Sequence, residues 1–254
     1  MDGTAFQVFG LTAWPLAFSL LVVFLAGAVR GYSGFGFSAL CVASLALVLP
    51  PAQVVPVILM LEVAASVGML PQVWRELDWR ALALLSVGAV LGTPLGIVFL
   101  AEVPADTARI AISLLVLTAS LLLLLGYQLK GERGPKGTLA TGVVSGLVNG
   151  IGAVGGLPVV IFLLASAAAA ATTRAVLVAY LLLIDIYATG LAFSQDLLTW
   201  ELMGRFVVLL VPLFLGIALG SRHFLKAPPE SFRRFTLSLL IVLALLGLAR
   251  TLLI

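Results

Sequence analysis

Charged residues are scarce in this 254-residue chain, at 10% of the total, against about 25% in an average soluble domain. Hydrophobic residues make up 62%, and the mean hydropathy is +1.24. A water-soluble fold of this length needs a polar surface over its core, which this sequence lacks the residues to form. The composition therefore excludes a cytosolic enzyme, a nucleic-acid-binding domain and a disordered protein, and it predicts an integral membrane protein.

Cysteine and histidine are also scarce, with one residue of each. The single Cys41 excludes an intrachain disulfide and a cysteine-based metal site, and we expect it to be a small packing residue. His223 has no second histidine with which to form a metal site or a catalytic triad. Because a Gly-x-Ser-x-Gly motif and a paired-aspartate motif are missing too, we expect no catalytic residues, no metal and no cofactor, and an intramembrane enzyme is the least favoured class.

Apolar runs of about 20 residues, the length of a membrane helix, predict seven helices. They cover residues 11–30, 53–73, 80–100, 107–129, 175–194, 204–222 and 232–253. A further, shorter apolar run follows the glycines of segment 31–49. The uncharged segment 137–173 would be about 55 Å long as one helix, so it must fold back. We expect two short helices there, at 138–150 and 157–171, which either cross at a tilt or form a re-entrant hairpin.

The basic residues test this count of ten elements. If the N-terminus lies outside and the elements alternate, 11 lysines and arginines lie on the inner side and three lie on the outer side. A strong inner excess is typical of membrane proteins. Counting each glycine-broken pair as one crossing would turn the second half over and place a basic loop outside, so the charges argue against it. They do not distinguish two crossings from a re-entrant hairpin.

The two halves of the chain resemble each other. Gly92–Gly96 aligns with Gly216–Gly220 at an offset of 124, and the Gly31–Gly36 break stands opposite Gly146–Gly152 at an offset near 116. Five elements is an odd number, so the second copy is inserted upside down. The predicted fold is an all-α polytopic membrane protein of two inverted repeats of about five helices each, broken or shortened at the glycine-rich breaks. The boundaries are residues 1–129 for the first repeat, 130–137 for a cytoplasmic linker and 138–254 for the second repeat.

Two repeated motifs have a structural interpretation. Pro104–Arg109 matches Pro228–Arg233 in a pattern of proline, acid, hydroxyl and arginine, which suits the capped start of a helix. The Gly-x-x-x-Gly pairs at 92–96 and 216–220 are typical of closely packed membrane helices.

The glycine-rich breaks are the first candidate site. Irregular backbone survives in a membrane only where protein or a cavity satisfies its polar groups, and paired interrupted helices are typical of secondary transporters. Free N–H groups and helix N-termini at the midplane would suit a small anion, and we favour this interpretation over mere tight packing because the breaks are paired and carry polar residues. The candidate substrate-binding residues are Arg30, Gly31, Ser33, Gly34, Gly36, Ser38, Asn149, Gly150, Gly152, Gly155 and Gly156.

Charged residues inside the spans are the second candidate. Glu62 and Asp185 stand at related mid-helix positions, 123 residues apart, where an acid is costly. Burial favours the protonated acid, so both are candidates for proton coupling, or for a salt bridge to Arg30 or Arg174. Arg30 either lies at the inner interface or faces the cavity, and the same two alternatives hold for Arg174.

The glycine pattern resembles that of a known family. Gly27-x-x-x-Gly31-Tyr-Ser-Gly-Phe-Gly-Phe37 looks like the opening of the TauE/SafE family, the sulfite-exporter or toluene-sulfonate-uptake group. Gly142-x-x-x-Gly146-x-x-Asn-Gly-x-Gly-x-x-Gly-Gly-x-Pro158 is similar to that family's second copy. The resemblance implies a carrier of small sulfur-containing anions in the cell inner (plasma) membrane, with the two breaks as its binding region.

The leading hypothesis is therefore an alternating-access secondary transporter of sulfite, thiosulfate or an organosulfonate, in which Glu62 or Asp185 would carry a coupling proton. The alternatives are a passive anion channel, a carrier of a different small organic anion, and an accessory subunit. The expected partners are a small anionic substrate and membrane lipid, with no nucleic acid, and a homodimer is left open.

Overall fold

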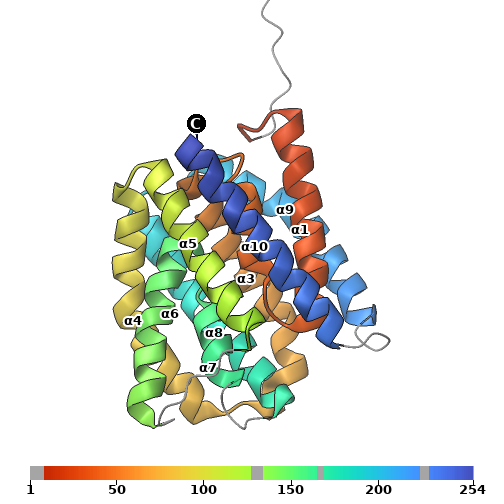
Figure 1. The fold of residues 1–254 in the computed structure, drawn as a ribbon, viewed down its shortest axis with the longest axis vertical. Coiled ribbons are helices and arrows are strands. Elements are labelled where there is room, and N and C mark those ends of the chain that lie inside the picture. The colour runs from red at the N-terminus through yellow and green to blue at the C-terminus, as the bar shows by residue number, and fades with distance from the viewer. Residues whose placement is uncertain (1–8, 127–133, 165–168, 224–228, 254) are drawn as a thin grey trace, which may run out of the picture.

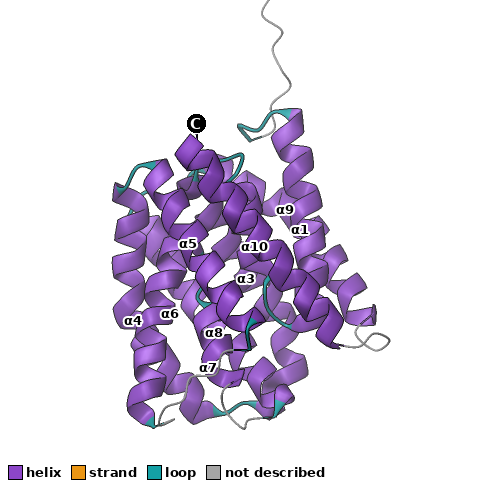
Figure 2. Ribbon diagram, in the orientation of Figure 1, coloured by secondary structure: helices purple, strands orange, loops and turns teal. Residues whose placement is uncertain are grey.

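The computed structural model describes residues 9–126, 134–164, 169–223 and 229–253, and this part of the chain is built from helices joined by short loops (Figure 2). The elements are α1 (Ala13–Ser33), α2 (Phe37–Leu45), α3 (Pro51–Val73), the 3-10 turn η1 (Trp74–Glu76), α4 (Trp79–Glu102), α5 (Ala105–Leu124), α6 (Pro135–Gly152), α7 (Gly156–Leu164), α8 (Ala170–Ser194), α9 (Trp200–His223) and α10 (Pro229–Leu253). The all-helical prediction is confirmed.

Six helices in the described ranges are long and apolar enough to cross a membrane, namely α1, α3, α4, α5, α8 and α9. The short helices α2 and α7 have only nine residues each. At 1.5 Å per residue each is about 14 Å long, less than half of the roughly 30 Å hydrocarbon layer. Neither short helix crosses a membrane alone, tilted or not.

Successive helices run in alternate directions. The start of α1 and the C-terminus lie at one end of the molecule, the top of Figure 1, and the turn between α3 and α4 lies at the other end. Four exposed tryptophans stand at helix ends: Trp14 and Trp200 near the starts of α1 and α9, and Trp74 and Trp79 around η1. This placement fits the interfacial anchoring that is typical of tryptophan in membrane proteins.

Three predicted helix ends differ from the structure by five residues or more. The fifth element stops at Leu124 rather than at 129, and α7 stops at Leu164 rather than at 171. Ala170 already belongs to α8, which was expected to begin at 175. The alanine-rich sequence before Thr172 favours helix equally on either side, so composition did not show which helix contains it.

The first break separates α1 from α2. The backbone turns left-handed at Gly34 (φ 80°) and again at Gly36 (φ 89°), where a side chain would be strained. The Gly34 N–H closes the end of α1 by donating to the Arg30 carbonyl at 2.7 Å. The predicted first break is thus confirmed, and these two glycines make it.

The second break separates α6 from α7, and α6 ends as α1 does, with a left-handed residue. Ala153 is left-handed (φ 53°), and its N–H donates to the Asn149 carbonyl at 2.7 Å. A non-glycine residue in this region of the backbone map is uncommon, and no sequence signal marked Ala153, since the turn was expected at the glycines around it. The second predicted break is also confirmed.

Glycines join α1 closely to α9. A Cβ atom on Gly27 would lie 2.8 Å from the Leu213 carbonyl oxygen, and one on Gly31 would overlap the Ile217 carbonyl. From the other side, a Cβ on Gly216 would overlap the carbonyl of Phe24. The two backbones therefore touch, as small residues allow in membrane proteins.

The same kind of contact joins α4 to α6. A Cβ on Gly150 would lie 2.6 Å from the Thr93 carbonyl oxygen, and one on Gly92 would overlap the Val143 carbonyl. The prediction that the Gly-x-x-x-Gly pairs serve close packing is confirmed for both α4 and α9. Each contact joins a helix of the first half of the chain to one of the second.

Arg109 of α5 fixes the short helix α2. Its Nε donates at 2.7 Å to the carbonyl of Ala46, the capping residue that follows α2, and its Nη1 pairs with the Asp106 carboxylate. A cation at a helix C-terminus is favourable. The motif that suggested a helix start therefore also holds the end of a neighbouring helix.

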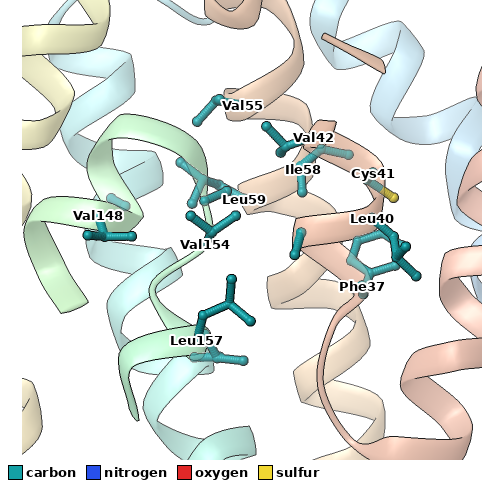
Figure 3. Packing of buried hydrophobic residues seen from close by; sticks show 14 of the residues in the cluster. Phe37, Leu40, Cys41, Val42, Val55, Ile58, Leu59, Val148, Val154 and Leu157 are labelled. Atoms are coloured by element: carbon teal, nitrogen blue, oxygen red, sulfur yellow. The ribbon is translucent and has the colours of Figure 1, made fainter. Parts of the chain in front are cut away.

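The apolar core lies around α2, α3 and the second break. In Figure 3, Val154 lies against Leu59 of α3, with Leu157 below it and with Ile58 of α3 and Phe37 on the side of α2; all five belong to one cluster. All five side chains are at most 3% exposed. The two broken segments thus pack on a shared interior, where the polar clusters also lie.

Candidate functional site

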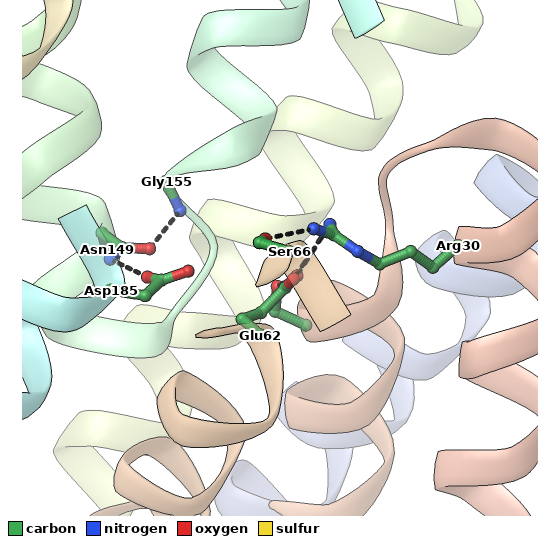
Figure 4. A network of polar contacts seen from close by, with 7 residues as sticks. Arg30, Glu62, Ser66, Asn149, Gly155 and Asp185 are labelled. Carbon is green, nitrogen blue, oxygen red and sulfur yellow. Dashed lines mark hydrogen bonds and ion pairs between the residues drawn. The ribbon is translucent and has the colours of Figure 1, made fainter. Parts of the chain in front are cut away.

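Arg30, in the last turn of α1, is completely buried and holds an acid of α3. Its Nη1 lies 2.9 Å from Oε2 and 3.2 Å from Oε1 of Glu62, and its Nη2 donates to Ser66 Oγ at 2.7 Å (Figure 4). Ser38, in the first turn of α2, donates its hydroxyl to Glu62 Oε1 at 2.5 Å. Three helices thus meet at one carboxylate.

The ion pair decides between the alternatives for Arg30. Its side chain is 0% exposed and points to the interior, not to an interface. A buried charge is tolerated only when it is paired and hydrogen-bonded, and Glu62 and Ser66 supply both. The salt bridge expected for one of the two acids is therefore present between Glu62 and Arg30.

The second acid, Asp185 of α8, has an uncharged partner. Asn149 Nδ2 donates to Asp185 Oδ1 at 2.7 Å, and the Gly155 N–H donates to Asn149 Oδ1 at 3.1 Å (Figure 4). Among the described residues, Asp185 Oδ2 has no hydrogen-bond partner, although the side chain is only 1% exposed. The amide thus links a mid-helix acid to the backbone of the second break.

A second link holds the same break. The Tyr180 hydroxyl donates to Ser145 Oγ at 2.7 Å, and the Ser145 hydroxyl donates to the Gly155 carbonyl at 2.5 Å. All three residues are buried. Both backbone polar groups of Gly155 are therefore satisfied by side chains, as irregular backbone in a membrane requires.

The two breaks border one small cavity. Gly36, Ser38 and Glu62 line it from the first half of the chain, and Gly156 and Leu157 line it from the second. Its volume is about 10 Å³, which is room for about one water molecule. The first turns of α2 and α7 therefore lie at a common interior space, which in this conformation is small.

Arg174 lies against the first break from the second half of the chain. A Cβ added to Gly34 would stand 3.0 Å from its Cγ and 3.2 Å from its Nε. The side chain is half-buried at the start of α8. A second cation thus lies beside the glycine turn that follows Arg30.

The other candidate glycines have different surroundings. Gly31 and Gly150 face the backbones of α9 and α4, and Gly152 faces the side chain of Ile112. Gly36 and Gly156 are the two that line the cavity. The side chain of Ser33 lies outside the described part of the structure.

Two residues of the site, Ser66 and Tyr180, were not predicted. Ser66 stands four residues after Glu62, on the same face of α3, and helical spacing from the buried acid would have found it. Tyr180 stands five residues before Asp185 in an apolar helix, and no sequence signal marked it. In the described ranges, three or more metal-binding side chains do not gather at any one place.

The comparison with family models assigns the chain to a family. The model of the sulfite exporter TauE/SafE family matches residues 19–246, nearly the whole chain. The chain belongs to the TauE/SafE family. No curated protein and no solved structure matches it. Together with the six apolar helices, membership makes this TauE/SafE protein a multi-pass membrane transporter of the sulfite-exporter type.

Proposed function

We propose that this protein is a secondary active transporter of small sulfur-containing anions, namely sulfite, thiosulfate or an organosulfonate, and that it works by alternating access between two inverted repeats. The observation that carries the proposal is the meeting of both helix breaks, each with a buried polar cluster, at one interior cavity. Secondary transporters bind their substrates between interrupted helices of paired repeats. The family supplies the chemical class of the anion.

Equivalent contacts support the inverted repeat. Gly31 faces the carbonyl of Ile217, and Gly150 faces the carbonyl of Thr93. Gly150 stands 119 residues after Gly31, and Ile217 stands 124 residues after Thr93. On these offsets α6 is the counterpart of α1, and α9 is the counterpart of α4. The contact of α1 with α9 therefore corresponds to the contact of α6 with α4.

A second pair of contacts has the same spacing. Gly92 faces the carbonyl of Val143, and Gly216 faces that of Phe24, again with offsets of 124 and 119. The offset near 116 assigned to the breaks from their glycines alone is therefore three residues too small. Helix contacts fix the alignment better because each glycine has a defined partner.

The anion would bind where three positive features converge. The N-terminal turns of α2 and α7 both lie at the cavity, and the unpaired N–H groups of a helix N-terminus attract anions. Arg30 adds a full positive charge, held next to the cavity-lining Glu62. Ser38 adds a hydroxyl that lines the cavity directly.

Glu62 competes with an anion for Arg30. While Glu62 is charged, it occupies the Arg30 guanidinium at 2.9 Å. A proton on Glu62 would weaken that pair and free the guanidinium for the substrate, so the anion and a proton would bind together. Asp185, with an amide partner and one unpaired oxygen among the described residues, is the second proposed proton carrier.

The small volume of the cavity favours a carrier over a passive channel. A space of about 10 Å³ is smaller than any sulfur oxyanion, so the anion needs a conformational change to enter. We place the protein in the inner membrane with its N-terminus outside. Lys136, Arg75 and Arg80 then lie on the inner side, opposite Arg109 and Arg205, in agreement with the positive-inside rule.

Counterflow in proteoliposomes tests the proposal. Proteoliposomes that contain the purified protein and are loaded with unlabelled sulfite should accumulate labelled sulfite, thiosulfate or isethionate from outside. Arg30→Lys keeps the charge but loses the two-pronged geometry, so we expect counterflow at least tenfold slower. Arg80→Lys, an exposed arginine at the start of α4, is the matched control and should behave like wild type. Absence of anion-dependent flux across the panel would overturn the proposal.

A further inference from the structure

Leu157, in the first turn of α7, lines two separate spaces. One is the small cavity between the breaks, which it shares with Ser38 and Glu62. The other is an apolar pocket of about 400 Å³ between α5, α6 and α7. Leu157 is only 3% exposed, so its side chain fills the boundary between the two spaces.

The small cavity has a polar side and an apolar side. Ser38 and Glu62, with Arg30 behind them, form the side that belongs to α2 and α3. Val154, Leu157 and Leu181 form the opposite side. An anion drawn to the polar side therefore has its remaining atoms directed at Leu157.

The apolar pocket beyond Leu157 would accept a hydrocarbon group. Its walls include Leu115, Leu122, Val144, Val148, Pro158 and Ile161. Its volume is many times that of the small cavity, and its rim at Thr118 and Val144 is exposed on the outer face of the bundle. The space for an apolar group thus exists, but Leu157 stands between it and the polar side.

We infer that Leu157 is a specificity-determining residue that limits the size of the transported anion by separating the cavity from this pocket. The inference rests on the proposed function. When the cavity widens to admit the anion, Leu157 leaves room beside the charged group for no more than a short apolar end. Shortening Leu157 joins the two spaces and lets a tail extend between α5 and α7.

The equivalent residue of the first half strengthens this assignment. Ser38 stands 119 positions before Leu157, the spacing that relates α1 to α6. Ser38 is the second residue of α2 and Leu157 is the second residue of α7, and both line the cavity. One position thus has opposite chemistry in the two halves: Ser38 contacts the charged cluster, and Leu157 faces the apolar side.

The experiment compares inhibition of sulfite counterflow by methanesulfonate, butanesulfonate and benzenesulfonate. In wild type, potency should fall with tail size. In Leu157→Ala, the inhibitory potency of benzenesulfonate relative to that of methanesulfonate should rise at least tenfold. Leu157→Val should give an intermediate size limit and provides a second test if the alanine variant folds poorly. The size-exclusion elution volume and the melting temperature of each variant are compared with those of wild type.

Ile161→Ala is the matched control, because Ile161 lines the same pocket but not the small cavity. It should leave the size profile unchanged. An unchanged profile in Leu157→Ala, the same gain in Ile161→Ala, or equal acceptance of benzenesulfonate by wild type would each overturn the inference. If a lipid acyl chain occupied the pocket and excluded the tail of the anion, the size profile of Leu157→Ala would be unchanged, which is the first of these results.

A parallel series from acetate to benzoate separates this inference from the proposed function. If the protein moves carboxylates but no sulfur anion, and Leu157→Ala still extends the size limit, the sulfur-anion proposal fails and the role of Leu157 stands. If wild type moves sulfite but the variants keep its size limit in both series, only the inference fails. If the protein transports neither the sulfur anions nor the carboxylates, both the proposed function and the inference about Leu157 fail.

Discussion

Arg30 and Asn149 hold equivalent positions at the ends of α1 and α6. The carbonyl of each accepts the N–H of a left-handed residue at 2.7 Å, and the side chain of each holds a mid-helix acid. In the first half the pair is ionic, Arg30 with Glu62, and in the second half it is an amide bound to Asp185. The fold thus places two acids in similar positions with different electrostatic surroundings.

The ion pair predicts a strong coupling between its partners. Arg30→Gln leaves the Glu62 charge buried without its counter-ion, which should lower the free energy of unfolding by about 3–5 kcal/mol. Glu62→Gln leaves Arg30 unpaired and should cost a similar amount. In the double variant neither charge remains, so much of the loss should be recovered. Unfolding in detergent measures the cycle, and additive losses would contradict the pairing.

The neutral partner of Asp185 predicts a different phenotype for its replacement. If Asp185 carries a coupling proton, Asp185→Asn removes that proton site while an amide still accepts from Asn149. Counterflow should persist, and uptake driven by a pH gradient should fall at least tenfold. Glu102→Gln changes an exposed acid at the end of α4 and serves as the control. An unchanged response of Asp185→Asn to the gradient would remove Asp185 from the coupling.

Glycine contacts predict where one methyl group is not tolerated. In Gly92→Ala and Gly216→Ala the new Cβ meets a backbone carbonyl that cannot move aside. Each should cost about 1–3 kcal/mol of stability through overpacking. Gly190→Ala, in α8, places its Cβ where nothing lies within 4 Å. It should be neutral or gain up to about 1 kcal/mol from helix propensity. Melting temperatures of the three variants test this, and equal effects would contradict the contacts.

Arg109 predicts a local effect on the short helix α2. Arg109→Ala removes the donor to the Ala46 carbonyl, a charged hydrogen bond worth about 1.5–3 kcal/mol. Hydrogen exchange should therefore become faster over residues 37–49 before it changes elsewhere. Arg75→Ala, at an exposed arginine of η1, should leave the exchange of α2 as it is. Unchanged exchange in Arg109→Ala would show that α2 does not need this anchor.

Much of the helix layout was predictable because hydropathy and glycine placement act locally. Apolar runs gave most spans, and the glycines around Gly34 marked the first break. The two mid-helix acids were visible for the same reason, since an acid such as Glu62 stands out in an apolar run. Helix ends in alanine-rich sequence were not predictable, because alanine favours helix in either direction.

Side-chain partners were less accessible to the sequence. Arg30 had two reasonable positions, and only packing brought it to Glu62, 32 residues away. Gly31 and Gly150 looked like binding residues, but their neighbours are the backbones of α9 and α4. Leu157 looked like any core leucine, and its place between two spaces depends on three helices at once. Such relations depend on distant segments, which one sequence does not pair.

The glycine contact between α1 and α9 also affects how the protein is made. The chain emerges N-terminus first, so α1 enters the bilayer when most of the protein, including Gly216, does not yet exist. Until α9 is made, the glycine face of α1 at Gly27 and Gly31 lacks the backbone against which it packs. Among the described helices α1 is synthesised first and its partner α9 much later, so a ribosome that stops before residue 200 leaves a product in which this glycine contact cannot form.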